Sequence, residues 1–242
     1  MTLELEPVSL SAPQAAFEFA ARTASRGAGP RAQPWERPHA EWERLAPRGL
    51  YARALREPFL LLATVLLVPV AAVLALPIAL VNAWVYRSVR RVLFAQRRVG
   101  WRGRVFTLYK FRTMLDLPGD DHTRVTRFGR FLRNTHLDEL PQLWNVLAGD
   151  MSLIGPRPEM VATERWAARH CPGFSERLVL KPGLTGHAQV TQGYTDGGDL
   201  AAYRAKLELN RCYRRALGLR LDCAILVRTV WWMLRGRGWN RR

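Results

Sequence analysis

Two adjacent carboxylic acids, Asp138 and Glu139, stand shortly before Pro141 in a chain that is otherwise strongly basic. Proline has no backbone N–H, so a helix with Leu143 and Leu147 on one face is expected to begin no earlier than about Asp138. The acids would then lie at the N-terminus of that helix, where unpaired N–H groups and the helix dipole lower the pKa of a carboxylate. Capping of the helix is the simplest interpretation of such a pair.

A second group of residues favours chemistry at a phosphate instead. Arg157 stands between Pro156 and Pro158, whose fixed φ angles predict a rigid loop that presents one guanidinium. A guanidinium can bond two phosphate oxygens at once. Further cations lie upstream of the acids, at Lys110, Arg112, Arg124 and Arg127.

Acids surrounded by arginines suggest two roles, which the spacing alone does not separate. Mg²⁺ binds one or two carboxylates and takes its other ligands from substrate oxygens and water. An ionised aspartate can instead attack phosphorus directly and form an acyl phosphate. We therefore expect a site for a phosphorylated ligand that uses a divalent metal, an aspartyl nucleophile or both.

The composition limits the partners without naming one. The formal charge of +17 indicates an anionic partner, which can be nucleic acid, anionic lipid or a phosphorylated small molecule. The three cysteines have no C-x-x-C spacing, so neither a disulfide framework nor a zinc site is expected. A length of 242 residues predicts one sizeable domain with a real core.

The elements that must position these residues begin with an apolar run. Residues 59–81 contain no charge and, as a helix, would be roughly 34 Å long, enough to cross a bilayer core of about 30 Å. Pro69 and Pro77 favour a kink. Basic residues flank both ends, and a spanning helix would place only one flank on the cytoplasmic side. A transmembrane helix and a bent, re-entrant helix hinged at a proline are therefore both possible, and the flanks favour the re-entrant form.

The rest of the chain divides by pattern. Residues 1–48 are rich in Ala, Pro, Arg and Glu and predict a disordered tail, with the membrane segment at 49–91. Alternating apolar residues on either side of Gly100–Gly103 predict a β-hairpin. Helices are expected over 124–147, broken at the acid pair, and over 199–216.

The last stretch of the chain predicts an amphipathic helix. Apolar residues there, including Trp231 and Trp232, lie among arginines, and Trp239 follows. This composition is typical of a helix in the headgroup layer of a membrane. A core helix with a basic tail is the alternative.

Three stretches together resemble a known family. They read "FAQRRVGWRGRVFTLYKFRTM", "RVTRFGRFLRNTHLDELPQLWNVLAGDMSLIGPRPEM" and "LKPGLTGHAQV". They are similar to the successive signatures of the bacterial sugar transferases, the monotopic polyprenyl-phosphate phosphoglycosyl transferases. The resemblance runs from about residue 58 to 232 and corresponds to the compact form of the family, with a soluble tail in place of an N-terminal helical bundle.

The resemblance implies a fold and a reaction. The fold would be α+β and predominantly helical, with a re-entrant membrane helix, a small β-hairpin and, over 92–242, a cytoplasmic catalytic domain with amphipathic interfacial helices. The reaction would move a sugar 1-phosphate from a UDP-sugar to polyprenyl (undecaprenyl) phosphate and release UMP. It would start the assembly of an exopolysaccharide, capsule, O-antigen or glycoprotein glycan at the cytoplasmic face of the inner membrane. Anionic lipid and downstream glycosyltransferases are further expected partners.

The resemblance also implies residue roles. Asp138 would be the nucleophile that forms a covalent phosphosugar intermediate, and Glu139 would help to hold Mg²⁺. Arg157 would bind phosphate, and Lys110, Arg112 and Arg127 are further candidates for that role. Pro77 would be the membrane hinge, with Pro69 as a competing position.

Several residues depart from the family pattern. Leu76 precedes the hinge proline where a serine is usual, and the entry to the membrane helix has Arg53 and Arg56 without the usual aspartate. His187 stands where many members have tryptophan, either to shape a sugar pocket or simply to pack.

Two other functions explain the sequence less well. A membrane-tethered nucleic-acid-binding protein would leave the acid pair unexplained and lacks a recognisable binding motif, so no nucleic-acid partner is expected. A non-catalytic scaffold would not need the intact acid pair.

Overall fold

The structure is a computed structural model that describes residues 33–117, 121–193 and 198–235. The expected tail is ordered in its last third: α2 spans His39–Leu45, and Trp35 and Trp42 are buried in the main core. Two large apolar rings bury enough surface to fix this segment, so the prediction of disorder is wrong for 33–48. Residues 1–32 and Trp239 lie outside the described residues.

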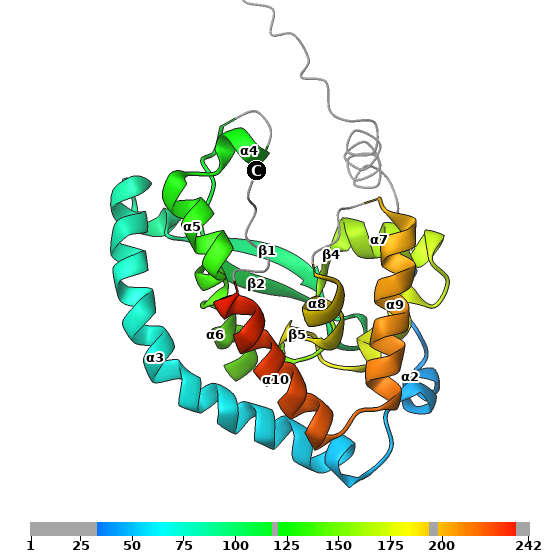
Figure 1. The fold of residues 1–242 in the computed structure, drawn as a ribbon. Helices are drawn as coiled ribbons and strands as arrows, with labels where there is room; N and C mark the ends of the chain where they lie inside the picture. The colour runs from blue at the N-terminus through cyan, green and yellow to red at the C-terminus, as the bar shows by residue number, and fades with distance from the viewer. Residues whose placement is uncertain (1–32, 118–120, 194–197, 236–242) are drawn as a thin grey trace, which may run out of the picture.

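The apolar run forms a long helix. A π-helical turn, η1 (Tyr51–Leu55), leads into α3 (Arg56–Val85), which continues unbroken through Pro69 and Pro77. Within the described residues it is the one helix long and apolar enough to cross a membrane. Figure 1 shows α3 as a bow along one side of the molecule.

Both ends of α3 are bonded to the rest of the protein. At the first end, the Arg56 guanidinium bonds the Asp222 carboxylate at 3.2 Å and the Ile154 carbonyl at 2.6 Å. At the other end, the Asn82 amide donates to the carbonyls of Val92 and Arg112 at 3.2 and 2.9 Å. The middle of the helix is largely exposed.

The predicted hairpin is confirmed. After η2 (Val89–Arg91), β1 (Leu93–Val99) pairs antiparallel with β2 (Val105–Phe111) across the short η3 turn (Trp101–Gly103). The short β4 (Glu159–Met160) pairs with the other edge of β1, giving the order β2-β1-β4.

The predicted helical region is also confirmed, with its break. It consists of α4 (Asp121–Arg124), α5 (Arg127–Thr135), the 3₁₀ turn η4 (Leu137–Glu139) and α6 (Gln142–Leu147). His136 separates α5 from η4 in a left-handed conformation, with φ of 57°.

The remaining elements complete a mostly helical α+β fold. A parallel pair of strands, β3 (Ser152–Ile154) and β5 (Gly183–Thr185), lies beside the first sheet. The last third of the chain is mostly helical: α7 (Val161–His170), η5 (Phe174–Val179), α8 (His187–Gln192), α9 (Leu200–Arg215) and α10 (Leu219–Leu234). Of these, α9 and α10 confirm predicted helices, whereas α7, η5 and α8 were not predicted.

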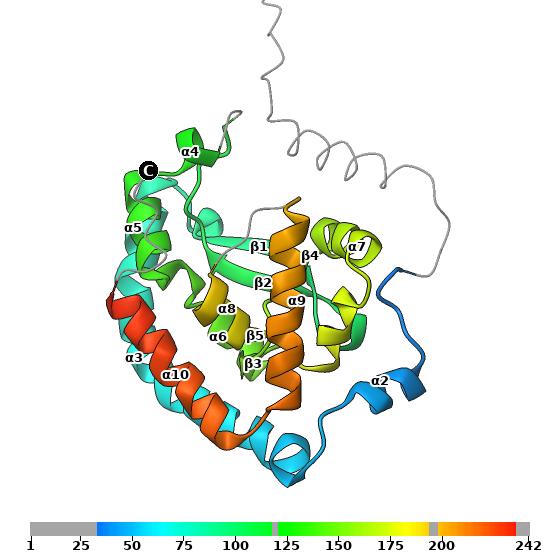
Figure 2. The same ribbon diagram turned by 45° about the vertical axis from the view of Figure 1, so that its right-hand side comes forward.

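One side of the molecule is apolar and exposed. The first turns of α10 lie near the start of α3 in both views (Figures 1 and 2), and Leu60 of α3 shares the main core with Ile225 of α10. The outward side chains of α10 include Val227 and Trp231, which are exposed. The core interpretation of α10 therefore applies to its inner face, while its outer face is an exposed apolar surface and its place at a membrane interface stays a prediction. We call the outer surface of α3 and α10 the apolar face.

Candidate active site

The acid pair lies in η4 rather than in the first turn of α6. Pro141 is the N-cap of α6, which begins at Gln142, and the left-handed His136 starts a separate 3₁₀ turn before it. That turn directs both acids inward, and Asp138 and Glu139 are only 6% and 8% exposed. The expected position at the start of a helix is thus displaced by one turn, and surface capping does not account for two buried acids.

The loop of Arg157 is held against the acids by a close backbone contact. Gly155 ends β3 and donates its N–H to the Thr185 carbonyl at 2.8 Å. A Cβ on Gly155 would collide with the Lys181 carbonyl oxygen, so only glycine permits this approach. From the loop, the Arg157 guanidinium bonds Glu139 Oε1 at 3.0 Å.

The hairpin supplies two more cations. Lys110 of β2 lies close enough to both acids to interact with their charges, while burial lowers the pKa of its ammonium. Arg98 of β1 donates to the Pro158 carbonyl at 3.1 Å, and burial together with the Arg157 charge lowers its pKa to about 10. The structure thus places the predicted Lys110 in the site and adds Arg98.

Arg133 is the second cation that the sequence reasoning missed. It lies on α5, donates from Nε to the Thr113 hydroxyl at 2.9 Å and lowers the pKa of Asp138. The one signal available in the sequence was its position in the last turn before the acid pair.

The two acids differ in their electrostatics. Burial, followed by the neighbouring Glu139 charge, raises the pKa of Asp138 to about 6. Burial would raise the pKa of Glu139 too, but Arg157 and Lys110 outweigh it and hold that pKa well below its usual range. Glu139 is therefore a permanent anion, and Asp138 becomes one near neutral pH.

Two predicted phosphate-binding residues lie elsewhere. Arg112 bonds Asp116 at 2.7 Å and stacks over Tyr86, near the end of α3. Arg127 is exposed at the start of α5, and no hydrogen bond in the described ranges joins it to the acids. Their roles in phosphate binding stay predictions.

The site has the donor chemistry that Mg²⁺ requires. No group of three or more His, Cys, Asp or Glu side chains gathers around one point in the described part of the chain. Two adjacent carboxylates fit a metal that takes its remaining ligands from substrate phosphates and water. Zinc, which prefers three or four protein ligands of nitrogen or sulfur, does not fit.

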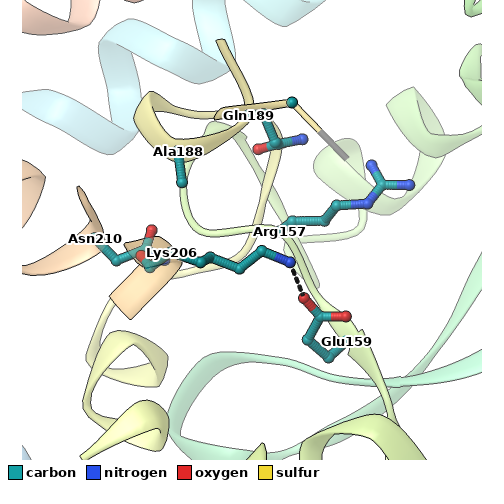
Figure 3. Close-up of a pocket in the computed structure, with 7 residues that line it drawn as sticks. Arg157, Glu159, Ala188, Gln189, Lys206 and Asn210 are labelled. Atoms are coloured by element: carbon teal, nitrogen blue, oxygen red, sulfur yellow. Dashed lines mark hydrogen bonds and ion pairs between the residues drawn. The ribbon is translucent and has the colours of Figure 1, made fainter. Parts of the chain in front are cut away.

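A small cavity adjoins Arg157 (Figure 3). Its volume is about 50 Å³, and it is lined by Arg157, Glu159, Ala188, Gln189, Gly193, Lys206 and Asn210. His187, the neighbour of Ala188, is half-buried and stacks on Tyr213 at 6.5 Å between ring centroids. That contact favours the packing interpretation of His187.

The site thus combines two buried acids with several cations, and the same molecule carries a long, exposed apolar helix. The model of the family described as bacterial sugar transferase matches residues 51–236. The chain therefore belongs to the bacterial sugar transferase family.

Relatives with curated names agree. The UDP-N-acetylgalactosamine-undecaprenyl-phosphate N-acetylgalactosaminephosphotransferase of Aeromonas hydrophila is 37% identical over 202 residues, which cover 80% of this chain and 47% of that protein. A UDP-glucose:undecaprenyl-phosphate glucose-1-phosphate transferase of Caulobacter vibrioides is 40% identical over 181 residues, covering 70% and 64%. One from Xanthomonas campestris is 39% identical over 150 residues, covering 57% and 31%. The chain spans less than two thirds of the length of each.

Proposed function

We propose that this protein transfers a sugar 1-phosphate from a UDP-sugar to polyprenyl phosphate and releases UMP, as the first step of a glycan assembly. The observation that carries the proposal is the buried acid pair, in which Glu139 is bonded to Arg157 and Asp138 lies among cations with its pKa near neutral. This arrangement supports a nucleophile that ionises at physiological pH beside groups that bind phosphate.

The transfer is proposed to take two displacements at Asp138. In the first, a carboxylate oxygen of Asp138 bonds the β-phosphorus, the bond from that phosphorus to the bridging oxygen breaks, and UMP leaves with the electron pair. In the second, an oxygen of polyprenyl phosphate attacks the same phosphorus and the Asp138 carboxylate leaves. The products are UMP and a polyprenyl diphosphosugar.

The surrounding cations have defined parts in these steps. Arg157 binds the oxygens of the β-phosphate and opposes the charge that develops on them. Lys110, Arg98 and Arg133 add positive charge close to the acids, which favours binding of the anionic diphosphate. Mg²⁺ held by Glu139 would neutralise the diphosphate and the departing UMP.

The apolar face supports a location at the membrane. Asn82 and Arg56, at opposite ends of α3, are bonded to the same folded body, so a helix that crossed the bilayer would carry part of that body into the lipid. We therefore propose that α3 is re-entrant, enters and leaves on the cytoplasmic side of the inner membrane, and holds the site at headgroup depth. α10 would lie in the interface beside it.

The test is UMP release by the full chain in detergent with Mg²⁺, undecaprenyl phosphate and a panel of UDP-sugars. We expect release from one or a few donors, and its loss in Asp138→Asn. Without acceptor, the wild type is expected to release about one UMP per protein and to gain the mass of a sugar phosphate. Asp150→Asn, an acid outside the site, is the matched control. Retained release in Asp138→Asn would refute the proposed nucleophile.

A further inference from the structure

The cavity beyond Arg157 is small, and most of the side chains that line it are polar or charged. Its 50 Å³ is enough for a few water-sized groups. Figure 3 shows that the side chains of three elements, the Arg157–Glu159 segment, α8 and α9, converge on it. A ligand bound at Arg157 could therefore insert one or two ring substituents into it.

The charges around the cavity cancel. Lys206 Nζ bonds Glu159 Oε1 at 2.9 Å, and both side chains are buried. On the wall nearest the acids, Arg157 is bonded to Glu139. A cavity whose ammonium is already neutralised by a carboxylate favours a neutral polar group over a second phosphate or a carboxylate.

One wall offers an acceptor that lacks a donor. Gln189 donates from Nε2 to the Leu184 carbonyl at 3.1 Å, whereas its Oε1 is buried and accepts no hydrogen bond from the described residues. Because Gln189 lines the cavity, an O–H or N–H group of a ligand that enters the cavity can supply the donor that this oxygen lacks.

Connectivity selects which part of the donor reaches this acceptor. In a UDP-sugar, the sugar is joined directly to the β-phosphate, whereas the α-phosphate and the ribose separate the uracil from it. Resting on the proposed function, we infer that this cavity is the specificity subsite for the donor sugar. Gln189 Oε1 accepts a hydrogen bond from a hydroxyl or acetamido N–H of the sugar.

Binding measurements test this without turnover. Affinities of UDP, UDP-glucose, UDP-galactose and their two N-acetylhexosamine counterparts would be measured for full-length protein in detergent, in an Asp138→Asn background. We expect Gln189→Met to reduce the spread of affinities among the four sugar nucleotides by about tenfold and to leave the affinity for UDP unchanged.

Gln192→Met is the matched control. Gln192 lies on the same helix, donates from Nε2 to the Ala202 carbonyl at 2.9 Å and also has a buried Oε1 without a partner among the described residues, but it does not line the cavity. Its substitution is expected to leave the spread unchanged.

A second variant covers the case in which Gln189→Met does not fold. Ala188→Val fills part of the cavity and removes no hydrogen-bonding group, so it should weaken every UDP-sugar relative to UDP. Two results together would overturn the inference, provided that both variants bind UDP normally. In Gln189→Met, the four sugar nucleotides would differ in affinity as much as they do in the wild type. In Ala188→Val, the affinity for each UDP-sugar relative to UDP would stay at the wild-type value. A protein that binds neither UDP nor any UDP-sugar would overturn the proposed function, and the inference with it.

Discussion

At the scale of single residues, the charge of each acid is set by what its own carboxylate touches. Glu139 is bonded to Arg157, whereas Asp138 has burial and a like charge against it. Two neighbours in sequence can thus have separate tasks, one as a fixed anion and one as a nucleophile that gains its charge near neutral pH.

This difference predicts an acidic limit to the reaction. Asp138 attacks only as a carboxylate, and its pKa is raised to about 6, so the rate of the UMP burst should fall as the pH drops through about 6. An unperturbed aspartate would give the same fall near about 4. The measurement is the burst rate against pH, with Asp150→Asn as control. If the burst rate of the wild type fell only near pH 4, the environment described for Asp138 would be contradicted.

The residues found from the sequence and those missed differ for a physical reason. Asp138, Glu139 and Arg157 were visible because short-range features, a proline and a proline-bracketed loop, restrict their backbone. Arg98 and Arg133 reach the site only through the register of β1 and the packing of α5, and nothing local in the sequence reports either. Trp35 and Trp42 were missed because a polar composition masked two anchoring rings.

At the scale of elements, α3 is anchored by a buried ionic group. The Asp222 carboxylate of α10 is fully buried and accepts hydrogen bonds from Arg56, Tyr51 and Tyr213. The sequence shows Glu57 beside Arg56, but Asp222, the buried carboxylate that also bonds Arg56, is 166 residues away. The hairpin, the apolar run and the helices over 124–147 and 199–216 were predicted from the sequence pattern, but this connection between α3 and α10 was not.

Asp222→Asn should therefore destabilise the protein. The buried Arg56 guanidinium would keep only the partly exposed Glu57, at 2.6 Å, as an ionic partner, and we expect the loss of the Asp222 charge to cost about 1–3 kcal/mol. Unfolding in detergent, followed by denaturant or heat, measures this. Glu208→Gln removes the exposed partner of Arg211 and should change stability by less than about 1 kcal/mol. Equal effects of the two variants would show that the Arg56 group is not an anchor.

The re-entrant arrangement of α3 has its own test. Single cysteines at Arg48 and Arg90, both exposed, would be introduced after Cys212 and Cys223 are replaced by serine. An impermeant thiol reagent is expected to label both positions from the cytoplasmic side and neither from the other. A cysteine at Leu74, in the exposed middle of the helix, should stay unlabelled from either side. Labelling of the two flanks from opposite sides would establish a spanning helix.

At the scale of the whole molecule, the exposed apolar area and the positive net charge both favour binding to a membrane. Their contributions to the free energy of binding differ in size and in their response to salt. Each basic residue near an anionic surface contributes about 1 kcal/mol, which salt screens. Each large apolar side chain removed from water contributes about 1.5–3 kcal/mol, which salt does not weaken. The exposed large apolar residues of α3 include Leu62, Leu66, Val70, Val73 and Leu80.

The protein should therefore stay with the membrane in 1 M NaCl and leave it only with detergent. Sedimentation of membranes after each wash, followed by immunodetection of the chain, measures this. Release by salt alone would mean that the +17 charge, and not the apolar face, holds the protein at the bilayer.

The distance in sequence between Arg56 and Asp222 also bears on how the protein is made. A ribosome completes the apolar helix long before it reaches the residues that anchor it, at about 5–20 residues per second. During those seconds Arg56, at the first end of α3, lacks its Asp222 partner, whereas the other end can already bond Val92 and Arg112. The bond of Arg56 to the Asp222 carboxylate is thus made late in synthesis, when the C-terminal helix arrives.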